Sequence, residues 1–582
     1  MRRIAKQGVP ANVLLIAAVG VASIFGLWGV GLGCSGDDGP EVELSTGGTG
    51  QGGTLLGGGG SGGTGGTGAG GEAPTHFADF PEEPVVEDGL PSDIADLFAG
   101  ATGSDTGGPC LAEPTLDAMV PSNWTPLYFQ WQAPTEQNVF ELRLEVENQL
   151  HDLVVYTTQP SFAMTRVIWT SFSDHSAGQD VEITLRGATL EGGALTAGPL
   201  LGASGAIHIA PVPAPGSVVY WAASGGTSFD GFMIGDDAPV TVLTPTSAGT
   251  TSTGGSTTCI SCHASSPDGE LIIYTRDADD ATRSIDVRMV DGSGGPAASV
   301  ITPTALNLLG RHKQAAPLLS SAHYEAGDAV ALAIFFDATL TAGQNEIIWT
   351  DLEADDMNDW GILARTGDAR QASSPQWSRD GATVAYVSSD TAGEGVIANG
   401  ACDIYTVPFN NRAGGSATPL AGASDAAYDE YYPVYSPNDA WIAFNRHDQG
   451  TGSYNIPEAE VFVVPGAGGT AVRLRANDPP ACTGLTSPGL TNSWPRWAPT
   501  ADEHDGLRYY WLVFSSKRRA AESAPTAPPI PQLYIAAVVT SEQGGVETIV
   551  EDYPALYVRS QNPDENNHTP AWENFVVDQV PR

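Results

Sequence analysis

One short pattern recurs six times in the C-terminal part of the chain, and it constrains the fold more than any other feature. One aligned position carries His or Pro in every copy: His263, Pro317, Pro375, Pro433, Pro495 and Pro570. The intervals between these residues are 54, 58, 58, 62 and 75 residues. Self-similarity at such a period predicts repeated supersecondary units that bury their apolar faces against one another.

Apolar strands follow the first five copies. The first strand after each turn is predicted at residues 271–274, 330–336, 384–387, 441–444 and 509–514, and the next at 287–290, 347–350, 404–407, 461–464 and 533–537. Runs of this length, rich in Val, Ile and aromatic residues and bounded by Gly, Asp or Asn, are typical of antiparallel strands. Each unit is therefore predicted to be a four-stranded blade.

The two ends of the array complement each other. Three strands are predicted before the first copy, at 218–222, 232–235 and 240–243, but no innermost strand accompanies them. One spare strand follows Pro570. Pairing the two ends would close a ring of six blades and remove the open edges of a linear stack.

The repeat resembles that of TolB-type six-bladed propellers, P-x-W-S-P-D-G-x-x-I-A-F. The resemblance is strongest at residues 374–386 (SPQWSRDGATVAY) and 432–444 (YPVYSPNDAWIAF), and it extends over about residues 216–578 of a predicted propeller domain at 216–582. The copy at Pro317 is degenerate, with Ser320-Ser321-Ala322-His323-Tyr324 in place of the turn signal. The resemblance implies a propeller that binds envelope proteins through one face.

Residues 113–213 show apolar alternation at period two, as in Leu127, Phe129 and Trp131. About seven short strands in roughly 100 residues predict a β-sandwich similar to immunoglobulin or fibronectin type III modules. Trp131 and Trp169 are predicted to fill its core. The predicted fold is thus all-β, with an N-terminal β-sandwich followed by a six-bladed β-propeller closed by the C-terminal strand.

Residues 1–34 resemble a bacterial lipoprotein signal: Arg2, Arg3 and Lys6 precede an uncharged run that ends at Cys34, the residue that would be lipidated. The run is also long enough to span a bilayer as an uncleaved anchor. Either way the body is exported to the cell envelope, in the outer membrane or facing the periplasm. Residues 35–112 are predicted to be a Gly/Thr/Ser-rich disordered tether and an acidic linker, with one short helix near residues 94–98.

Charge and motifs exclude some functions. The chain has 25 Lys and Arg against 68 Asp and Glu, a net charge of −43. Such a surface repels phosphate backbones, so no nucleic-acid partner is expected and the membrane is contacted through the lipid anchor. No G-x-S-x-G element follows the repeats, so a self-standing hydrolase is not expected.

Cys259, Cys262 and His263 form a C-x-x-C-H motif at the first copy. This is the attachment motif of c-type haem, in which two thioethers hold the porphyrin and the His is the proximal iron ligand. Two other interpretations remain open. The cysteines could form a short disulfide or be inert thiols, or the three residues could bind zinc with a distant His.

The phase of the repeat predicts a second iron ligand. His568 lies two residues before Pro570, in the blade beside His263, and His312 is the alternative in the blade on the other side. The competing role for His568 is a hydrogen bond within the closing strand. Cys402 and Cys482, in predicted loops of adjacent blades, are predicted to form a disulfide that leaves Cys110 odd.

Two functions follow from these patterns. In the first, a haem c at Cys259, Cys262 and His263 transfers electrons to or from a redox partner. In the second, the protein is a scaffold without cofactor that binds envelope proteins through the propeller face, as the resemblance to TolB implies.

Overall fold

The computed structural model describes residues 79–100, 106–224, 227–250, 255–278, 283–290, 300–311, 314–335, 345–391, 395–450, 452–518, 529–575 and 577. The predicted signal segment with Cys34 and the Gly/Thr/Ser-rich tether lie outside these residues. Strands dominate the described part, so the prediction of an all-β chain is confirmed. In these ranges no helix has the length and apolar character needed to cross a membrane.

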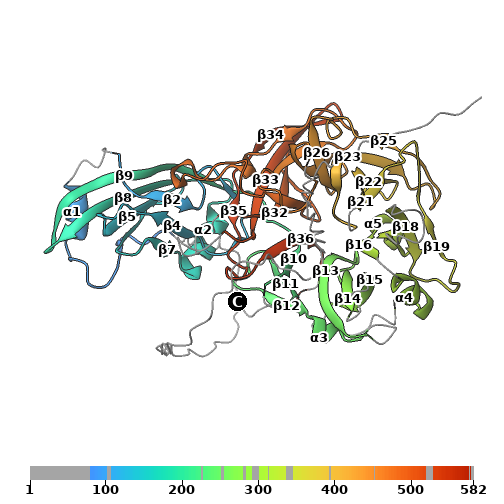
Figure 1. Cartoon of the computed structure of the whole chain (residues 1–582). Helices are drawn as coiled ribbons and strands as arrows, with labels where there is room; N and C mark the ends of the chain where they lie inside the picture. Colours follow the sequence, from blue (N-terminus) through green and yellow to red (C-terminus); the bar gives the residue numbers. More distant parts are fainter. Residues whose placement is uncertain are drawn as a thin grey trace, which may run out of the picture. The chain divides into compact units, whose positions relative to one another are not determined.

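Two sheets form the N-terminal unit (Figure 1). The larger has the order β1 (Val85–Val86), β6 (Leu153–Thr157), β5 (Val139–Glu145), β8 (Asp180–Glu191), β9 (Ala194–Ile209) and β3 (Met119–Val120). The smaller contains β2 (Cys110–Glu113), β4 (Tyr128–Gln132) and β7 (Ser161–Ala163).

Alternating side chains of the two sheets share one core. Phe129 and Trp131 on β4 are buried in the same cluster as Leu142 and Leu144 on β5, as period-two burial requires. Trp131 and Trp169 are each 2% exposed, which confirms their predicted place in the core. Trp169, however, lies on a helix, α2 (Arg166–His175), rather than on a strand.

The acidic stretch predicted as a linker takes part in this unit. β1 pairs in parallel with β6, and β2 pairs with β4. The short helix predicted near residues 94–98 is present as α1 (Ile94–Ala99), which buries Ile94 and Phe98, one helical turn apart. The structured unit therefore begins before residue 113, and the predicted boundary was too late.

The remaining described residues form six antiparallel sheets and one two-stranded parallel sheet, of β20 (Ala364–Thr366) and β24 (Gly414–Ser416). The first joins β12 (Val240–Leu243), β11 (Ser228–Met233), β10 (Ser217–Ala222) and β36 (Asn567–Glu573). The second and third contain β13 (Thr257–Ser265), β14 (Leu271–Ala278) and β15 (Arg283–Met289), then β16 (Gln314–Leu319), β17 (Val330–Phe335), β18 (Glu346–Asp351) and β19 (Trp360–Ile362).

The other three sheets are also antiparallel, and the last has six strands, two of which, β31 (Asp502–His504) and β35 (Leu556–Tyr557), are short. They contain β21 (Gln371–Trp377), β22 (Thr383–Thr391), β23 (Asn399–Pro408) and β25 (Thr418–Pro419), then β26 (Tyr428–Tyr435), β27 (Trp441–Asp448), β28 (Glu460–Pro465) and β29 (Val472–Arg473), and lastly β30 (Ser493–Trp497), β32 (Leu507–Ser516), β33 (Gln532–Gln543) and β34 (Val546–Asp552). The degenerate turn after Pro317 is replaced by a short helix, α5 (Ser321–Glu325).

The C-terminal strand completes the first sheet, as the sequence predicts. β36 runs antiparallel to β10, with Val218 opposite Trp572. Trp572 is 1% exposed, and its Nε1–H donates a hydrogen bond of 2.6 Å to the Pro215 carbonyl. The first strands of the sheets contact one another in the order β13, β16, β21, β26, β30 and β36, and β36 contacts β13.

The aligned position of the repeat coincides with a break in strand pairing. The residue just before it has a positive φ in all six copies: Cys262 (34°), Ala316 (55°), Ser374 (44°), Tyr432 (54°), Trp494 (59°) and Thr569 (41°). In five copies this residue and the following proline have no ladder partner, so the missing proline N–H removes no hydrogen bond. His263, which has an N–H, pairs with Tyr274, so at this break only Cys262 is unpaired.

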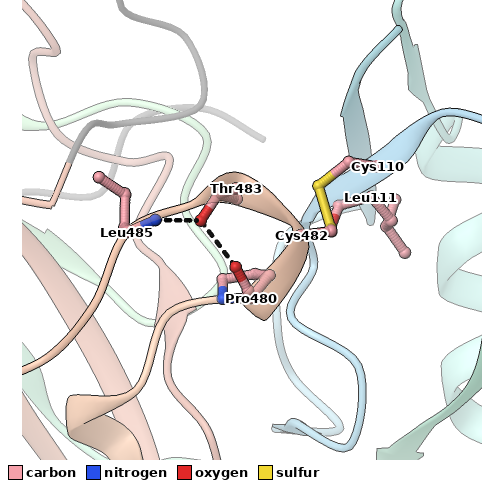
Figure 2. Close-up of a disulfide and its surroundings, with 6 residues drawn as sticks. All are labelled: Cys110, Leu111, Pro480, Cys482, Thr483 and Leu485. Atoms are coloured by element: carbon pink, nitrogen blue, oxygen red, sulfur yellow. Dashed lines mark hydrogen bonds between the residues drawn. A yellow bond between two sulfur atoms is a disulfide. The ribbon is translucent and has the colours of Figure 1, made fainter. Parts of the chain in front are cut away.

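A disulfide joins the N-terminal unit to the six sheets. Cys110 on β2 bonds to Cys482 in the short helix η2 (Ala481–Thr483) (Figure 2). The predicted pairing of Cys402 with Cys482 is wrong. Cys402 lies on β23 rather than in a loop, and its free thiol is buried in a hydrophobic cluster, whereas Cys482 bonds to Cys110. Arg475, which forms an ion pair with Asp117, adds a second link between the two parts.

Replacing Cys110 and Cys482 together with Ser is expected to lower the melting temperature of the full chain. The bond closes a sequence separation of 372 residues, and a disulfide of this kind stabilises by about 2–4 kcal/mol, mainly by restricting the unfolded chain. Thermal unfolding with and without a reducing agent measures the effect. Reduction should lower the melting temperature of the wild type by more than it lowers that of the double variant. Equal melting temperatures for both oxidised proteins would contradict this.

Candidate functional site

The six pairing breaks bring side chains from six strands to one cavity. Cys262, Ala316, Ser374, Tyr432, Trp494 and Thr569 all line it. The cavity contains about 470 Å³ of space free of protein atoms, part of it open to solvent. The rings of Tyr432 and Trp494 stack there with centroids 3.7 Å apart. We call this cavity the aromatic pocket. A bulge redirects side chains, and here six of them converge.

A second cavity adjoins the first. The two share four lining residues, which are His263, Leu318, Gln376 and Arg496. The second cavity is also lined by Arg379 and Glu573, and it contains about 630 Å³ of space free of protein atoms, again partly open. We call it the arginine pocket, because two guanidinium groups lie in its wall.

The C-x-x-C-H motif lies on β13, an edge strand of its sheet. Cys262 lines the aromatic pocket and carries a free thiol, whereas Cys259 is 1% exposed. The two cysteines are therefore not joined to each other, which excludes the short disulfide. Burial raises the pKa of the Cys262 thiol to about 11. The thiol is protonated at neutral pH and is a poor nucleophile.

His263 is held by packing and by one backbone hydrogen bond. Its Nε2 lies 2.9 Å from the Val219 carbonyl oxygen, so this nitrogen carries the proton and donates. The Phe229 ring centroid is 4.4 Å from the imidazole. Burial lowers the pKa of His263 to about 4, so the ring is neutral at pH 7. Nδ1 is left without a hydrogen-bond partner among the described residues.

These residues, as arranged, do not fit a covalent haem. Attachment needs two accessible thiols and an imidazole open to the iron. Cys259 is 1% exposed, and the His263 ring is packed against Phe229 with Nε2 bound to a carbonyl. The haem hypothesis therefore gains no support from this geometry and stays a prediction for spectroscopy.

The predicted second ligand is not in the pockets. His568 lies opposite Trp221 in the β10–β36 ladder, and the two rings are 6.0 Å apart. Its neighbour Thr569 lines the aromatic pocket instead. His312 lies outside the described residues. Across the described ranges, no three His, Cys, Asp or Glu side chains are grouped as a metal site would require.

Two residues that sequence reasoning missed are Arg379 and Arg496. Arg496 follows Pro495 directly, at a position where the other proline copies carry Leu318, Gln376, Val434 and Ala571. A charged residue at a position that is otherwise apolar or uncharged is a signal that alignment of the repeats could have found. Arg379 lies in the turn after Trp377, where charged residues are ordinary.

Comparison with known proteins gives distant similarities only. No protein-family model matches the chain, and no curated protein matches it. Among solved structures, the chain is similar to TolB from Acinetobacter baumannii, at 15% identity and a TM-score of 0.35, covering 68% of this chain and 79% of that one. A protein from Agrobacterium tumefaciens described as a TolB is similar at 15% identity and a TM-score of 0.30, covering 60% and 95%.

A third similar structure is the acylaminoacyl peptidase of Pyrococcus horikoshii, at 12% identity and a TM-score of 0.25, covering 64% of this chain and 51% of that one. Similarity at these scores carries no argument about function. The function is therefore inferred from the residues of this chain.

The buried state of His263 predicts a pH-dependent contribution to stability. Its folded pKa of about 4 lies below the unfolded value of about 6.5, so the contribution is complete above pH 6.5 and is lost as the pH falls toward 4. Over that interval it amounts to about 3 kcal/mol. Urea unfolding measures the difference in the free energy of unfolding between the wild type and the His263→Gln variant. This difference should shrink by up to the same amount between pH 7 and pH 4. His504→Gln, at a half-exposed ring, is the control. A constant difference for His263→Gln would contradict the assignment.

Proposed function

We propose that this chain is an exported scaffold whose six C-terminal sheets close into a six-bladed β-propeller and bind a partner protein at the aromatic and arginine pockets. The observation that carries the proposal is the convergence of one residue from each of six equivalent strands on a single cavity. Binding sites are typically concave and combine apolar side chains with a few polar groups that fix the orientation of the ligand. The two adjoining pockets likewise combine apolar side chains with polar groups.

Ring closure has its own support. Each innermost strand contacts the next, the last contacts the first, and the C-terminal strand pairs with β10. A closed array leaves no open innermost edge, which is the way propellers avoid edge-to-edge aggregation. Along the sequence, the immunoglobulin-like two-sheet unit follows the N-terminal segment and precedes the propeller.

Export is supported by two independent features. Residues 1–34 resemble a lipoprotein signal with Cys34 as the acylated residue, and Cys110 is bonded to Cys482. Disulfides persist in oxidising compartments and are rare in the cytosol of most organisms. We therefore place the protein in the cell envelope, tethered by its lipid, with other envelope proteins as partners.

Binding accounts for the pocket chemistry better than catalysis. The thiol of Cys262 is protonated at neutral pH because burial raises its pKa to about 11. His263 is neutral, and its Nε2–H is engaged with a backbone carbonyl. Neither group in this state provides an activated nucleophile.

A photo-crosslinking residue placed at Gln376 tests partner binding. Gln376 is half-buried and lines both pockets. The full chain carrying benzoylphenylalanine there should form crosslinked adducts with a partner protein in the cells that make it. The same residue at Leu150, which is 83% exposed on the N-terminal unit, is the control. Adducts from Leu150 but not from Gln376 would contradict the proposed binding face.

An absorption spectrum of the purified chain separates this function from electron transfer. The scaffold function predicts no Soret band and no haem stain on the denatured chain. A haem c would give both, and the stain would be lost in a Cys262→Ala variant, because only thioether-linked haem stays on an unfolded polypeptide. A His568→Ala variant with an altered spectrum would add His568 to the iron ligands.

A further inference from the structure

The arginine pocket is an electrostatic exception in this chain. Arg365, Arg370, Arg412 and Arg446 illustrate the general case, since each forms an ion pair with a carboxylate. Arg379 and Arg496 form no ion pair with any described residue. Both line the same cavity of a protein whose net charge is −43. Leaving two cations unpaired where carboxylates are so abundant requires an explanation.

Arg496 is the more constrained of the two. It lines both pockets, and burial lowers its pKa. Its Nη1 donates a hydrogen bond of 2.9 Å to the carbonyl of Pro495. A guanidinium has five N–H donors, and no other hydrogen bond from this one reaches a described residue. Arg496 is half-buried, so its remaining donors face the cavity, where an acceptor from outside the chain would satisfy them.

The neighbouring carboxylates are already engaged. Glu573 lines the arginine pocket, but its Oε2 accepts hydrogen bonds from the backbone N–H of Ser265, at 2.6 Å, and from the Ser265 hydroxyl. Asp439 accepts from the backbone N–H groups of Arg379, at 2.6 Å, and Asp380, at 3.0 Å. Neither carboxylate lies within ion-pair distance of the two guanidinium groups. The charged residues of the lining are therefore two arginines and one glutamate, and the glutamate carboxylate accepts its hydrogen bonds from Ser265.

Uncharged donors and aromatic rings complete the wall. Trp497 and Trp572 each donate their indole N–H to a backbone carbonyl, of Val434 and Pro215 respectively. Trp377 occupies the equivalent position of its own copy and is 7% exposed, yet its Nε1–H has no partner among the described residues. The side-chain amide of Gln376 likewise forms no hydrogen bond with them. The pocket thus offers donors next to large apolar surfaces.

We propose that the arginine pocket binds a ligand that carries one carboxylate on an aromatic or other apolar group. Arg496 and Arg379 hold the carboxylate, and Trp377 and its aromatic neighbours contact the apolar group. A single negative charge matches the excess of one cation in the lining, whereas a dianion such as phosphate would bring a larger desolvation penalty. The inference rests on the proposed binding function and adds the chemistry of the ligand.

Two sources could supply this chemistry: the C-terminal residue of a partner protein or a free aromatic acid. N-acetylphenylalanine represents the first and benzoate the second, and N-acetylphenylalanine amide is the neutral match to the first. Isothermal titration of the full chain should show binding of N-acetylphenylalanine, with the amide weaker by about tenfold or more, the loss expected for a charged hydrogen bond. Tighter binding of benzoate than of the acetylated residue would identify a free acid as the ligand.

Variants locate the site. Arg496→Gln and Arg379→Gln should each weaken binding of the carboxylate by about tenfold or more, and Arg496→Lys should recover only part of the loss, because it keeps the charge without the planar fork. Arg311→Gln is the matched control, since Arg311 also lacks a carboxylate partner among the described residues but lies over Trp360, outside both pockets. Arg379 is in a surface turn, so its variant reports on binding even if Arg496→Gln fails to fold.

Three results would overturn the proposal: no binding of either acid up to about 10 mM, equal binding of acid and amide, or full binding by the Arg379→Gln variant. If crosslinks from Gln376 persist in any of these cases, partner binding stands and only the carboxylate chemistry fails. If the crosslinks are absent as well, the binding function fails with it.

Discussion

The break in strand pairing at the aligned position is the constraint on which the C-terminal sheets depend. A positive φ at a residue other than Gly costs about 1–2 kcal/mol, and this conformation occurs in all six copies. In the five copies with proline, this residue offsets part of the backbone cost by restricting the unfolded chain. It removes no ladder hydrogen bond, because the position is unpaired. Packing of the redirected side chains supplies more, as the stack of Tyr432 on Trp494 shows. The same distortion that shapes each strand therefore also builds the shared cavity.

This constraint is also the reason that much of the fold could be predicted. His263 and the five prolines at the aligned position located one strand in each of the six antiparallel sheets, and a count of strands at the two ends predicted that β36 pairs with β10. The N-terminal region was harder. β1 has two residues and pairs in parallel with a distant strand, which leaves no local pattern in an acidic, Pro-containing stretch. Trp169 fits both period two and a helix, and only the capping of Ile168 N–H by the Thr165 side chain distinguishes them.

The cysteines could not be assigned from sequence for a related reason. A C-x-x-C-H motif describes spacing along the chain, whereas thioether attachment depends on both thiols and the imidazole being open on one side. On β13 the position of each residue in the sheet determines its surroundings. Cys259 is 1% exposed, Cys262 lines a pocket, and His263 binds the Val219 carbonyl. The partner of Cys482 was likewise hidden, because Cys110 lies 372 residues away in a stretch with no strand signal.

Arg496 is a charged residue at a position where the fold does not require a charge. At the same position of the other proline copies Leu318, Gln376, Val434 and Ala571 serve, so no charge is needed to form the strand or its pairing. Burial lowers the pKa of the Arg496 guanidinium, and the nearby Glu573 carboxylate opposes this shift only in part, without forming an ion pair. The residue is therefore less favourable for folding than its counterparts. A bound molecule that supplies the missing acceptor accounts for its presence. The burial that disfavours the unpaired charge in the empty pocket also strengthens each hydrogen bond from the guanidinium to an anion bound there.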